Sequence, residues 1–512
     1  MHRSPVRVVV GALAMLATLG AGLFALWLVL GPDGELTGRP AASHEDPEAT
    51  PRAGNIPSAA AGSESASTSQ TEPAATRSQS GDTTLLADLR LPLPVEPSPV
   101  LSSPSGPSLD RQALRGALRP LLKDPDLRRH TGLLVRDLGR DEEVLRAGAK
   151  GPFTSASSLK LLTATAALSE LGDDHRFETS VVQARSRPAR RPTLALIGGG
   201  DPLLASTPAA AELRGYPRGA TLAALAADTV RELRADGVRQ IRLGYDAGMF
   251  TGLAEARTWE SGYVPDGVVS PVSALQVDGG AFGSGADPAR AAANAFGQAL
   301  TASGVRVTGG EPVKLRVPSG SEEIAVGRGA ALEDVVEHIV QVSDNEGAEI
   351  LLRHVGLATG RAGSFAGGAA GARAVLDELG VPVTDLTMDD GSGLSRSNRV
   401  GLDSLLAVLT LGADADHPDL RVITTGLPVA GFTGSLRPRF MDAVSTPGRG
   451  LVRAKTGTLK QVHALAGTVV TRDGTLLGFA ALTDRVRLRD NLDARQQIDQ
   501  VAAALAECGC TG

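Results

Sequence analysis

The sequence predicts a mixed α/β (α+β) fold, an antiparallel sheet with flanking helices, placed behind an N-terminal transmembrane helix and a disordered linker. Two pairs of strand-like stretches, each joined by a short turn of Gly, Asp and Arg, indicate β-hairpins. Several segments rich in Ala and Leu have apolar residues at helical spacing, which indicates helices between and after the hairpins. An uncharged run near the N-terminus precedes a long stretch of low complexity.

The N-terminal segment, residues 1–31, is interpreted as a signal anchor. Arg3 and Arg7 precede residues 8–30, which carry no charge and would span about 35 Å as a helix, enough to cross a bilayer. The basic flank stays in the cytoplasm, so we expect a single-pass protein of the cell membrane with the rest of the chain on the extracytoplasmic side. The alternative is a protein secreted after signal cleavage, although no small-x-small site follows directly.

The next segment, residues 32–107, is rich in Pro, Ser, Ala, Thr and Glu and contains no Phe, Trp or Tyr. Such a composition cannot bury a core, because it offers too little apolar surface to offset the entropy of ordering the chain. We therefore predict a disordered linker that holds the following domain away from the membrane.

The ordered part is predicted to begin near residue 108, and its elements follow from periodicity and turn residues. The expected helices are residues 110–122, 157–171, 221–235, 288–303, a pair within 331–356 broken at 343–345, 367–379, 403–411 and 492–506. The expected strands are residues 132–138 and 143–147 in one hairpin, 193–197, and 461–470 and 475–483 in a second hairpin.

Composition excludes several classes of protein. The net charge of −6 argues against a nucleic-acid partner. The only two cysteines, Cys508 and Cys510, are separated by one glycine, which is poor spacing for a zinc site, and the eight histidines are scattered without a His-Glu-x-x-His motif. We expect no metal and no cofactor.

The first chemical motif is Ser157-Ser158-Leu159-Lys160 at the start of a predicted helix. A serine hydroxyl needs a base within hydrogen-bond reach to become a nucleophile, and residues three apart lie on the same face of a helix. Lys160 can therefore sit beside Ser157, and a buried lysine can lose its proton and act as that base. Thr154 or Ser155 is expected to cap the helix.

Lysine usage supports a chemical interpretation of this motif. Among 51 Lys and Arg residues only six are lysines, and arginine cannot give up a proton. The alternative is a solvated lysine on an amphipathic helix, and this motif alone favours that alternative.

A second motif, Ser343-Asp344-Asn345, falls at the predicted break between two helices. It places a hydroxyl and an amide two residues apart. The alternative interpretation is an ordinary capped helix start.

A third motif, Lys455-Thr456-Gly457-Thr458, opens the strand run near the C-terminus. Lys455 offers a positive charge, and Thr456 and Thr458 share one face of the strand. Gly457 is expected to let a substrate backbone approach closely.

The set Ser-x-x-Lys, Ser-x-Asn and Lys-Thr-Gly, in this order, is shared by penicillin-binding proteins and serine β-lactamases. The chain more closely resembles the D-alanyl-D-alanine carboxypeptidase/endopeptidase family, the class C low-molecular-mass penicillin-binding proteins. The resemblance covers roughly residues 108–506. The stretches that carry it are residues 155–164, 199–202, 271–275, 390–396, 427–431, 434–436, 439–440 and 453–459.

This resemblance implies a domain organisation. A penicillin-binding-protein/serine β-lactamase-like transpeptidase domain would occupy residues 108–185 and 324–512, with a large inserted β-rich domain at residues 186–323. Ser157 and Ser343 are 186 positions apart, far more than a β-lactamase leaves between them.

The resemblance also implies an activity. It suggests a serine-type D-alanyl-D-alanine carboxypeptidase, or endopeptidase, that cleaves peptidoglycan stem peptides through an acyl-serine intermediate and is inhibited by β-lactam antibiotics. Ser157 would attack the carbonyl of the penultimate D-alanine and Lys160 would take its proton. Ser343 would relay a proton to the departing D-alanine, helped by the charge of Lys455, and Asn345 would bind the backbone of the stem peptide.

Substrate binding is implied for four further residues. Thr456 and Thr458 would hold the terminal carboxylate, beside Gly457, and the amides of Ser157 and Thr458 would form an oxyanion hole. Asp390 would organise the site, although without the resemblance residues 390–393 are equally well a plain turn.

Two other functions are weighed against this one. A serine β-lactamase needs a deacylating base, but no Glu-x-x-Leu-Asn stretch lies between Ser343 and Lys455, and Glu346 and Glu349 lie on the helix after the turn. An inactive wall-binding scaffold on the same fold would be expected to lack the nucleophile or its lysine, whereas all three motifs are complete here.

Overall fold

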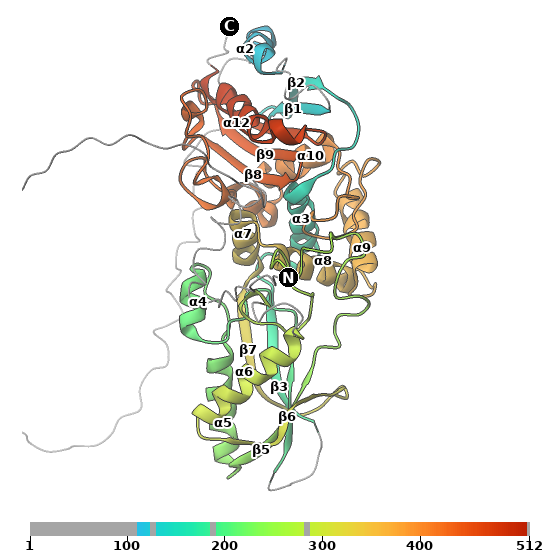
Figure 1. Cartoon of the computed structure of the whole chain (residues 1–512), viewed down its shortest axis with the longest axis vertical. Coiled ribbons are helices and arrows are strands. Elements are labelled where there is room, and N and C mark those ends of the chain that lie inside the picture. The colour runs from blue at the N-terminus through green and yellow to red at the C-terminus, as the bar shows by residue number, and fades with distance from the viewer. Residues whose placement is uncertain (1–109, 123–129, 185–190, 281–286, 509–512) are drawn as a thin grey trace, which may run out of the picture. The chain divides into compact units, whose positions relative to one another are not determined.

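The structure is a computed structural model that describes residues 110–122, 130–184, 191–280 and 287–508 (Figure 1). The predicted anchor at residues 1–31 and linker at residues 32–107 lie outside these ranges. The described residues belong to a single folded unit. Within them, no helix is both long enough and apolar enough to span a membrane.

The first sheet has five antiparallel strands in the order β2-β1-β10-β9-β8. Both predicted hairpins are confirmed in it. The strands are β1 (Thr131–Asp137), β2 (Glu142–Gly148), β8 (Val452–Leu459), β9 (Val462–Val470) and β10 (Leu476–Thr483).

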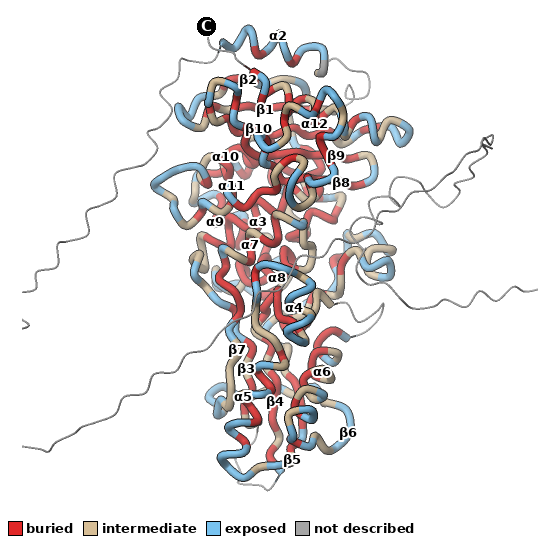
Figure 2. Tube along the Cα trace, turned by 90° about the vertical axis from the view of Figure 1, so that its left-hand side faces the viewer, coloured by how far each residue is buried: buried red, intermediate tan, exposed pale blue. Residues whose placement is uncertain are grey.

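Helices cover both faces of this sheet. Successive residues of β9 alternate between two cores, with Ala464 and Ala466 in one and Leu465 and Val469 in the other. The first core is closed by α3 (Leu159–Leu171) and α10 (Leu402–Ala413), and the second by α2 (Arg111–Leu122) and α12 (Asn491–Glu507). The central strands β9 and β10 are buried along nearly their whole length (Figure 2). Burial on both faces explains why their sequences are nearly continuous apolar runs.

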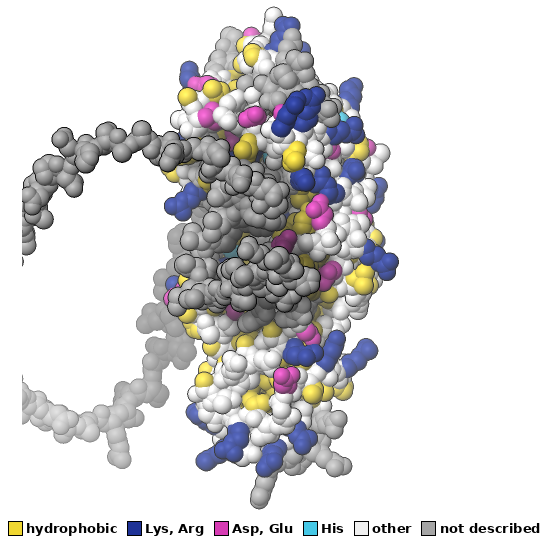
Figure 3. Space-filling model, in the orientation of Figure 1, with side chains coloured by type: hydrophobic (Ala, Val, Ile, Leu, Met, Phe, Trp, Pro, Cys, Tyr) yellow, Lys and Arg dark blue, Asp and Glu magenta, His cyan; other side chains and the backbone are white. Residues whose placement is uncertain are grey.

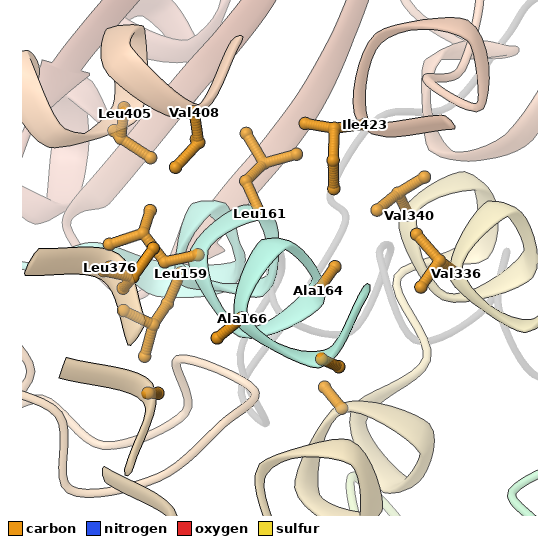
Figure 4. Packing of buried hydrophobic residues seen from close by; sticks show 14 of the residues in the cluster. Leu159, Leu161, Ala164, Ala166, Val336, Val340, Leu376, Leu405, Val408 and Ile423 are labelled. Atoms are coloured by element: carbon orange, nitrogen blue, oxygen red, sulfur yellow. The ribbon is translucent and has the colours of Figure 1, made fainter. Parts of the chain in front are cut away.

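Helix α3 is the most deeply buried helix beside the sheet. Its residues from Leu159 to Leu168 are all buried, since other helices pack against it on several sides. Leu161, for example, lies between Val408 of α10 and Ile423 of α11 (Figure 4). The other helices of this part are α7 (Leu332–Val342), α8 (Asn345–Ala358), α9 (Phe365–Glu378) and α11 (Val422–Thr425).

The second sheet is mixed, in the order β6-β5-β4-β3-β7. Strands β4, β5 and β6 are parallel, and helices α5 and α6 take part in the crossovers and share a third core with the sheet. The elements are β3 (Arg176–Gln183), β4 (Thr193–Ile197), α4 (Pro208–Arg214), α5 (Leu222–Ala235), β5 (Gln240–Asp246), α6 (Pro288–Ala302), β6 (Arg306–Lys314) and β7 (Glu323–Ala331).

This second region differs from the expected insertion in two ways. Its sheet reaches from residue 176 to residue 331, beyond the bounds of 186 and 323, because α3 runs into β3 after only four residues and β7 runs directly into α7. No linker composition marks either boundary. The region is also α/β rather than mainly β, since the Ala-rich segments form α5 and α6.

The surface and the C-terminus complete the description. On the face shown in Figure 3, Lys and Arg side chains are spread over both regions, with Asp and Glu among them, rather than gathered along one stripe. Cys508, which follows α12, is disulfide-bonded. Cys510 lies outside the described residues.

Candidate active site

Ser157 lies in a short 3-10 turn, Ala156–Ser158, immediately before α3. The predicted cap is wrong: neither Thr154 nor Ser155 accepts a capping hydrogen bond, and Ser158 Oγ instead donates to the carbonyl of Ser155. Ser157 is half-buried. Residues three apart nearly eclipse in a 3-10 turn, so Ser157 still faces Lys160.

Lys160 is completely buried, and its Nζ contacts three acceptors. It lies 2.7 Å from Asn345 Oδ1, 2.7 Å from the carbonyl oxygen of Ser392 and 3.2 Å from Ser157 Oγ. The contact with Ser157 is the longest. If the amine loses one proton, its lone pair can therefore face the serine while the two stronger acceptors keep the remaining hydrogens.

Ser343 and Lys455 form a second pair. Ser343 ends α7 in the left-handed conformation, with φ of 64°, which turns the chain into α8. Lys455, on β8, is completely buried, and its Nζ donates to Ser343 Oγ at 2.8 Å and to the carbonyl of Thr456 at 3.0 Å. Because the Ser343 oxygen accepts from Lys455, its own hydroxyl hydrogen can be donated elsewhere.

Asn345 begins α8 and joins two parts of the chain. Its Oδ1 accepts from Lys160, and its Nδ2 donates to the carbonyl of Val268 at 2.8 Å. The side chain therefore positions Lys160 in this structure. One Nδ2 hydrogen is used by Val268, and the amide carries a second.

Strand β8 forms the edge of the first sheet next to the Ser157 turn. Gly457 is needed there, because a Cβ at this position would lie 3.0 Å from the Ser155 carbonyl oxygen and 2.8 Å from Ala464. Close approach of the turn that carries the nucleophile is therefore one reason for glycine here, and the close approach of a substrate backbone stays a prediction. Thr456 is buried and donates to Ser435 Oγ at 2.9 Å, whereas Thr458 is exposed.

The turn that follows Asp390 is held by this buried carboxylate. Asp390 accepts from the backbone N–H groups of Gly393 and Ser395, at 2.9 and 2.6 Å. It also accepts from Asn398 Nδ2 at 2.6 Å and from the indole Nε1 of Trp259 at 2.9 Å. Asp390 therefore organises the backbone of this turn rather than facing solvent.

The same turn touches the nucleophile. Gly393 has φ of 85°, and a Cβ there would lie 1.9 Å from the carbonyl oxygen of Ala156. Only glycine allows this contact.

Five residues take part in the site although no role in it was predicted for them. They are Glu349, Ser392, Ser435, Trp259 and Val268. Glu349 could have been found, because it is a carboxylate within an apolar run on the helix that Asn345 begins. The others act through backbone carbonyls or come from distant segments, and local patterns do not identify such residues.

Burial sets the protonation of the two lysines. Desolvation lowers the pKa of Lys160 to about 8, against the opposing effect of nearby carboxylates, Glu349 foremost. Desolvation, with a smaller contribution from the charge of Lys160, holds the pKa of Lys455 well below its ordinary value. A lysine with a pKa near 8 is neutral in about a tenth of the molecules at pH 7, far more than at its ordinary pKa, and the neutral amine is the form that acts as a general base.

No group of three side chains suited to holding a metal ion occurs among the described residues. The arrangement instead offers a hydroxyl beside a buried amine, a second hydroxyl beside a second amine, and the exposed edge of a strand. Such an arrangement can support nucleophilic attack by Ser157 on a carbonyl.

Comparison with known proteins agrees with this chemistry. Residues 114–285 and 283–505 match the family described as D-Ala-D-Ala carboxypeptidase 3 (S13). The chain is 30% identical to a carboxypeptidase of Mycobacterium tuberculosis, over 83% of this chain and 92% of that protein. It is 32% identical to the carboxypeptidase DacB of Mycolicibacterium smegmatis, over 82% of this chain and 90% of that protein.

The fold is also similar to a solved structure. Penicillin binding protein 4 of Haemophilus influenzae aligns with a TM-score of 0.61 and 20% identity, covering 78% of this chain and 98% of that one. A further structure of that protein is a complex with a β-lactam. This likeness concerns the fold alone.

Proposed function

The chain belongs to the D-Ala-D-Ala carboxypeptidase 3 (S13) family, and we propose that its Ser157 carries the acyl group during cleavage of the terminal D-alanine from peptidoglycan stem peptides. The protein is a serine-type D-Ala-D-Ala carboxypeptidase. The observation that carries the assignment of Ser157 is its contact with the buried amine of Lys160.

In the first step, Ser157 Oγ attacks the carbonyl carbon of the penultimate D-alanine while Lys160 Nζ takes the hydroxyl proton. Asn345 and the Ser392 carbonyl hold the amine in place. Breaking of the C–N bond then releases D-alanine, whose nitrogen needs a proton. Ser343 relays it: its hydroxyl hydrogen passes to the nitrogen, while the charged amine of Lys455, which donates to Ser343 Oγ at 2.8 Å, returns a proton to that oxygen.

The terminal carboxylate of the substrate would be held beside Thr456 and Thr458. An anion at this place favours the charged form of Lys455, so binding of the carboxylate raises the pKa that burial has lowered. Substrate binding and protonation of Lys455 are therefore linked. Water finally attacks the acyl ester and releases the shortened peptide.

The oxyanion formed during attack needs donors, and the edge of β8 supplies one. The N–H of Ala454 donates to the carbonyl of Pro428, away from β9. N–H groups of alternate residues in a strand point to the same side, so that of Thr458 points to this outer edge. It would act there with the N–H of Ser157, which lies in the first turn of a helical segment, where the amides have no partner within the helix.

Glu349 bears on the alternative, a β-lactamase. Both of its carboxylate oxygens accept backbone N–H groups, from Gly391 and Ser392. A carboxylate used in this way does not activate a deacylating water. A slow release of bound β-lactam therefore fits the site better than rapid turnover.

The test uses the full-length chain and a fluorescent penicillin. We expect a stable covalent label on the wild type and none on Ser157→Ala, because only the hydroxyl can form the ester. Ser158→Ala is the matched control and should keep the label, since the Ser158 hydroxyl donates to the Ser155 carbonyl. Labelling of Ser157→Ala at the wild-type level would disprove the assignment, and rapid loss of label from the wild type would favour the β-lactamase.

We further propose that residues 1–31 anchor the protein in the cell membrane, with the catalytic domain on the extracytoplasmic side, where peptidoglycan lies. The uncharged run after Arg3 and Arg7 supports this proposal. Cell fractionation should find the full chain in the membrane fraction and a chain without residues 1–31 outside it. Release of the full chain into the medium would instead indicate secretion after signal cleavage.

A further inference from the structure

We propose that Glu349 is a positioning residue for acyl transfer, which fixes the turn at residues 391–393 so that its Ser392 carbonyl holds Lys160 beside Ser157. This inference rests on the proposed role of Ser157. Glu349 lies on α8, one helical turn after Asn345, and its side chain is completely buried.

The first contact is between Glu349 and the turn. Oε2 accepts from the N–H of Gly391 at 2.8 Å, and Oε1 accepts from the N–H of Ser392 at 2.9 Å. Two bonds from consecutive amides to one carboxylate define the orientation of the peptide groups. Burial, and then the charge of Asp390, raise the pKa of Glu349 to about 8, and the two N–H donors oppose that shift because they stabilise the ionised form. In that form the two hydrogen bonds are strongest and hold the turn firmly.

The second contact is between the turn and the base, Lys160. The carbonyl of Ser392 accepts from Lys160 Nζ at 2.7 Å, and this bond is shorter than the 3.2 Å contact between Nζ and Ser157 Oγ. A rotation of the Ser392 peptide would therefore move the amine away from the serine. Thr163 of α3 fixes the neighbouring peptide by donating to the Gly391 carbonyl at 2.8 Å.

The third contact joins the turn to the nucleophile. Gly393 lies against the backbone of Ala156 and Ser157, close enough to exclude any side chain. The turn thus lies between Glu349, the base and the nucleophile. A loss of its geometry would change both ends of the Lys160–Ser157 contact.

Glu349 also contributes charge. Among the groups that act on Lys160, the carboxylate of Glu349 has the largest favourable effect, followed by Asp390, Asp344 and Glu346, while Lys455 is a nearby like charge. Glu349 itself faces Asp390 and Arg353. Removal of the negative charge at residue 349 should therefore lower the pKa of Lys160 further.

The test measures the rate constant of acylation by a fluorescent penicillin as a function of pH, with the full-length chain. Lys160 acts in its neutral form, so wild-type acylation should rise with pH through about 8. In Glu349→Gln only one amide finds an acceptor, and the new NH₂ group faces a donor. We expect the maximal acylation rate to fall about tenfold or more. We also expect the increase of the rate with pH to occur at lower pH than in the wild type.

Two further variants separate position from charge. Glu349→Asp keeps the charge but is one methylene shorter, so the rise should stay near its wild-type pH while the maximal rate falls. Thr163→Val removes a neutral contact to the same turn, so it should lower the maximal rate without moving the rise. Thermal unfolding confirms that each variant is folded before its rate is measured.

The proposal is overturned if Glu349→Gln has the wild-type rate and pH profile. It is also overturned if the three variants lose rate equally and none moves the rise, since Glu349 would then be only a structural residue. Either result leaves the role of Ser157 intact, because that role depends on the label lost in Ser157→Ala.

Discussion

The two five-stranded sheets of this chain are built differently. The first is antiparallel and buried on both faces, and its strand β8 carries Lys455, Thr456 and Thr458. The second is mixed, and its outer strand β6 is exposed along most of its length. The two lysines of the proposed acyl transfer, Lys160 and Lys455, thus lie where packing leaves a side chain little freedom, as precise placement requires.

The second region nevertheless reaches the site through one loop. Val268 and Ser270 contact Asn345 and Glu346 at the start of α8, and Trp259 contacts Asp390. We therefore expect that changes of packing within the second sheet leave the site intact as long as this loop keeps its position.

The largest expected difference in acylation rate is between substitutions of two lysines, one in each region. Lys160→Arg should lower the acylation rate about 10²–10⁴-fold, because a guanidinium stays charged and cannot act as the base. Lys314→Arg, on the exposed strand β6, should leave the rate unchanged. Rates measured with a fluorescent penicillin test the pair, and wild-type acylation by Lys160→Arg would remove Lys160 from the mechanism.

A second contrast uses two leucines that are completely buried, Leu465 on β9 and Leu196 on β4. Replacement of either by Ala should lower the free energy of unfolding by about 3–5 kcal/mol, because it removes buried methyl groups and leaves a cavity. Leu465 pairs with Thr456, so Leu465→Ala should also slow acylation several-fold, in contrast to Leu196→Ala.

Urea unfolding and labelling rates, measured where both variants are folded, check these two effects. If Leu465→Ala and Leu196→Ala lose acylation rate equally, packing in the second region supports the site as much as packing in the first.

The smallest contrast concerns two aromatic donors. Trp259→Phe removes the indole bond to Asp390 and should slow acylation about tenfold, as expected when a buried carboxylate loses one partner. Tyr245→Phe removes a bond to Asp287 inside the second region and should leave the rate within about twofold. If Trp259→Phe acylates at the wild-type rate, the loop does not support the site.

Local patterns predicted much of the fold. The two hairpins of the first sheet, the helix break at Ser343 and the closing helix are confirmed close to their expected bounds, because each is defined by turn residues and periodicity within a short stretch. The second sheet extends beyond the predicted bounds of the insertion at both ends, since α3 runs into β3 and β7 into α7 without a linker. The helix cap was also wrong, because the chain enters α3 through a 3-10 turn.

The sequence by itself determined which side chains are proposed to do the chemistry, since two serines, two lysines and an asparagine stand in three short motifs of characteristic spacing. Tertiary structure alone decided their environment. The depth at which Lys160 is buried, the use of Glu349 as a backbone acceptor and the contact of Trp259 with Asp390 each join segments far apart in the chain. A shifted pKa depends on everything packed around the group, and no stretch of sequence contains that information.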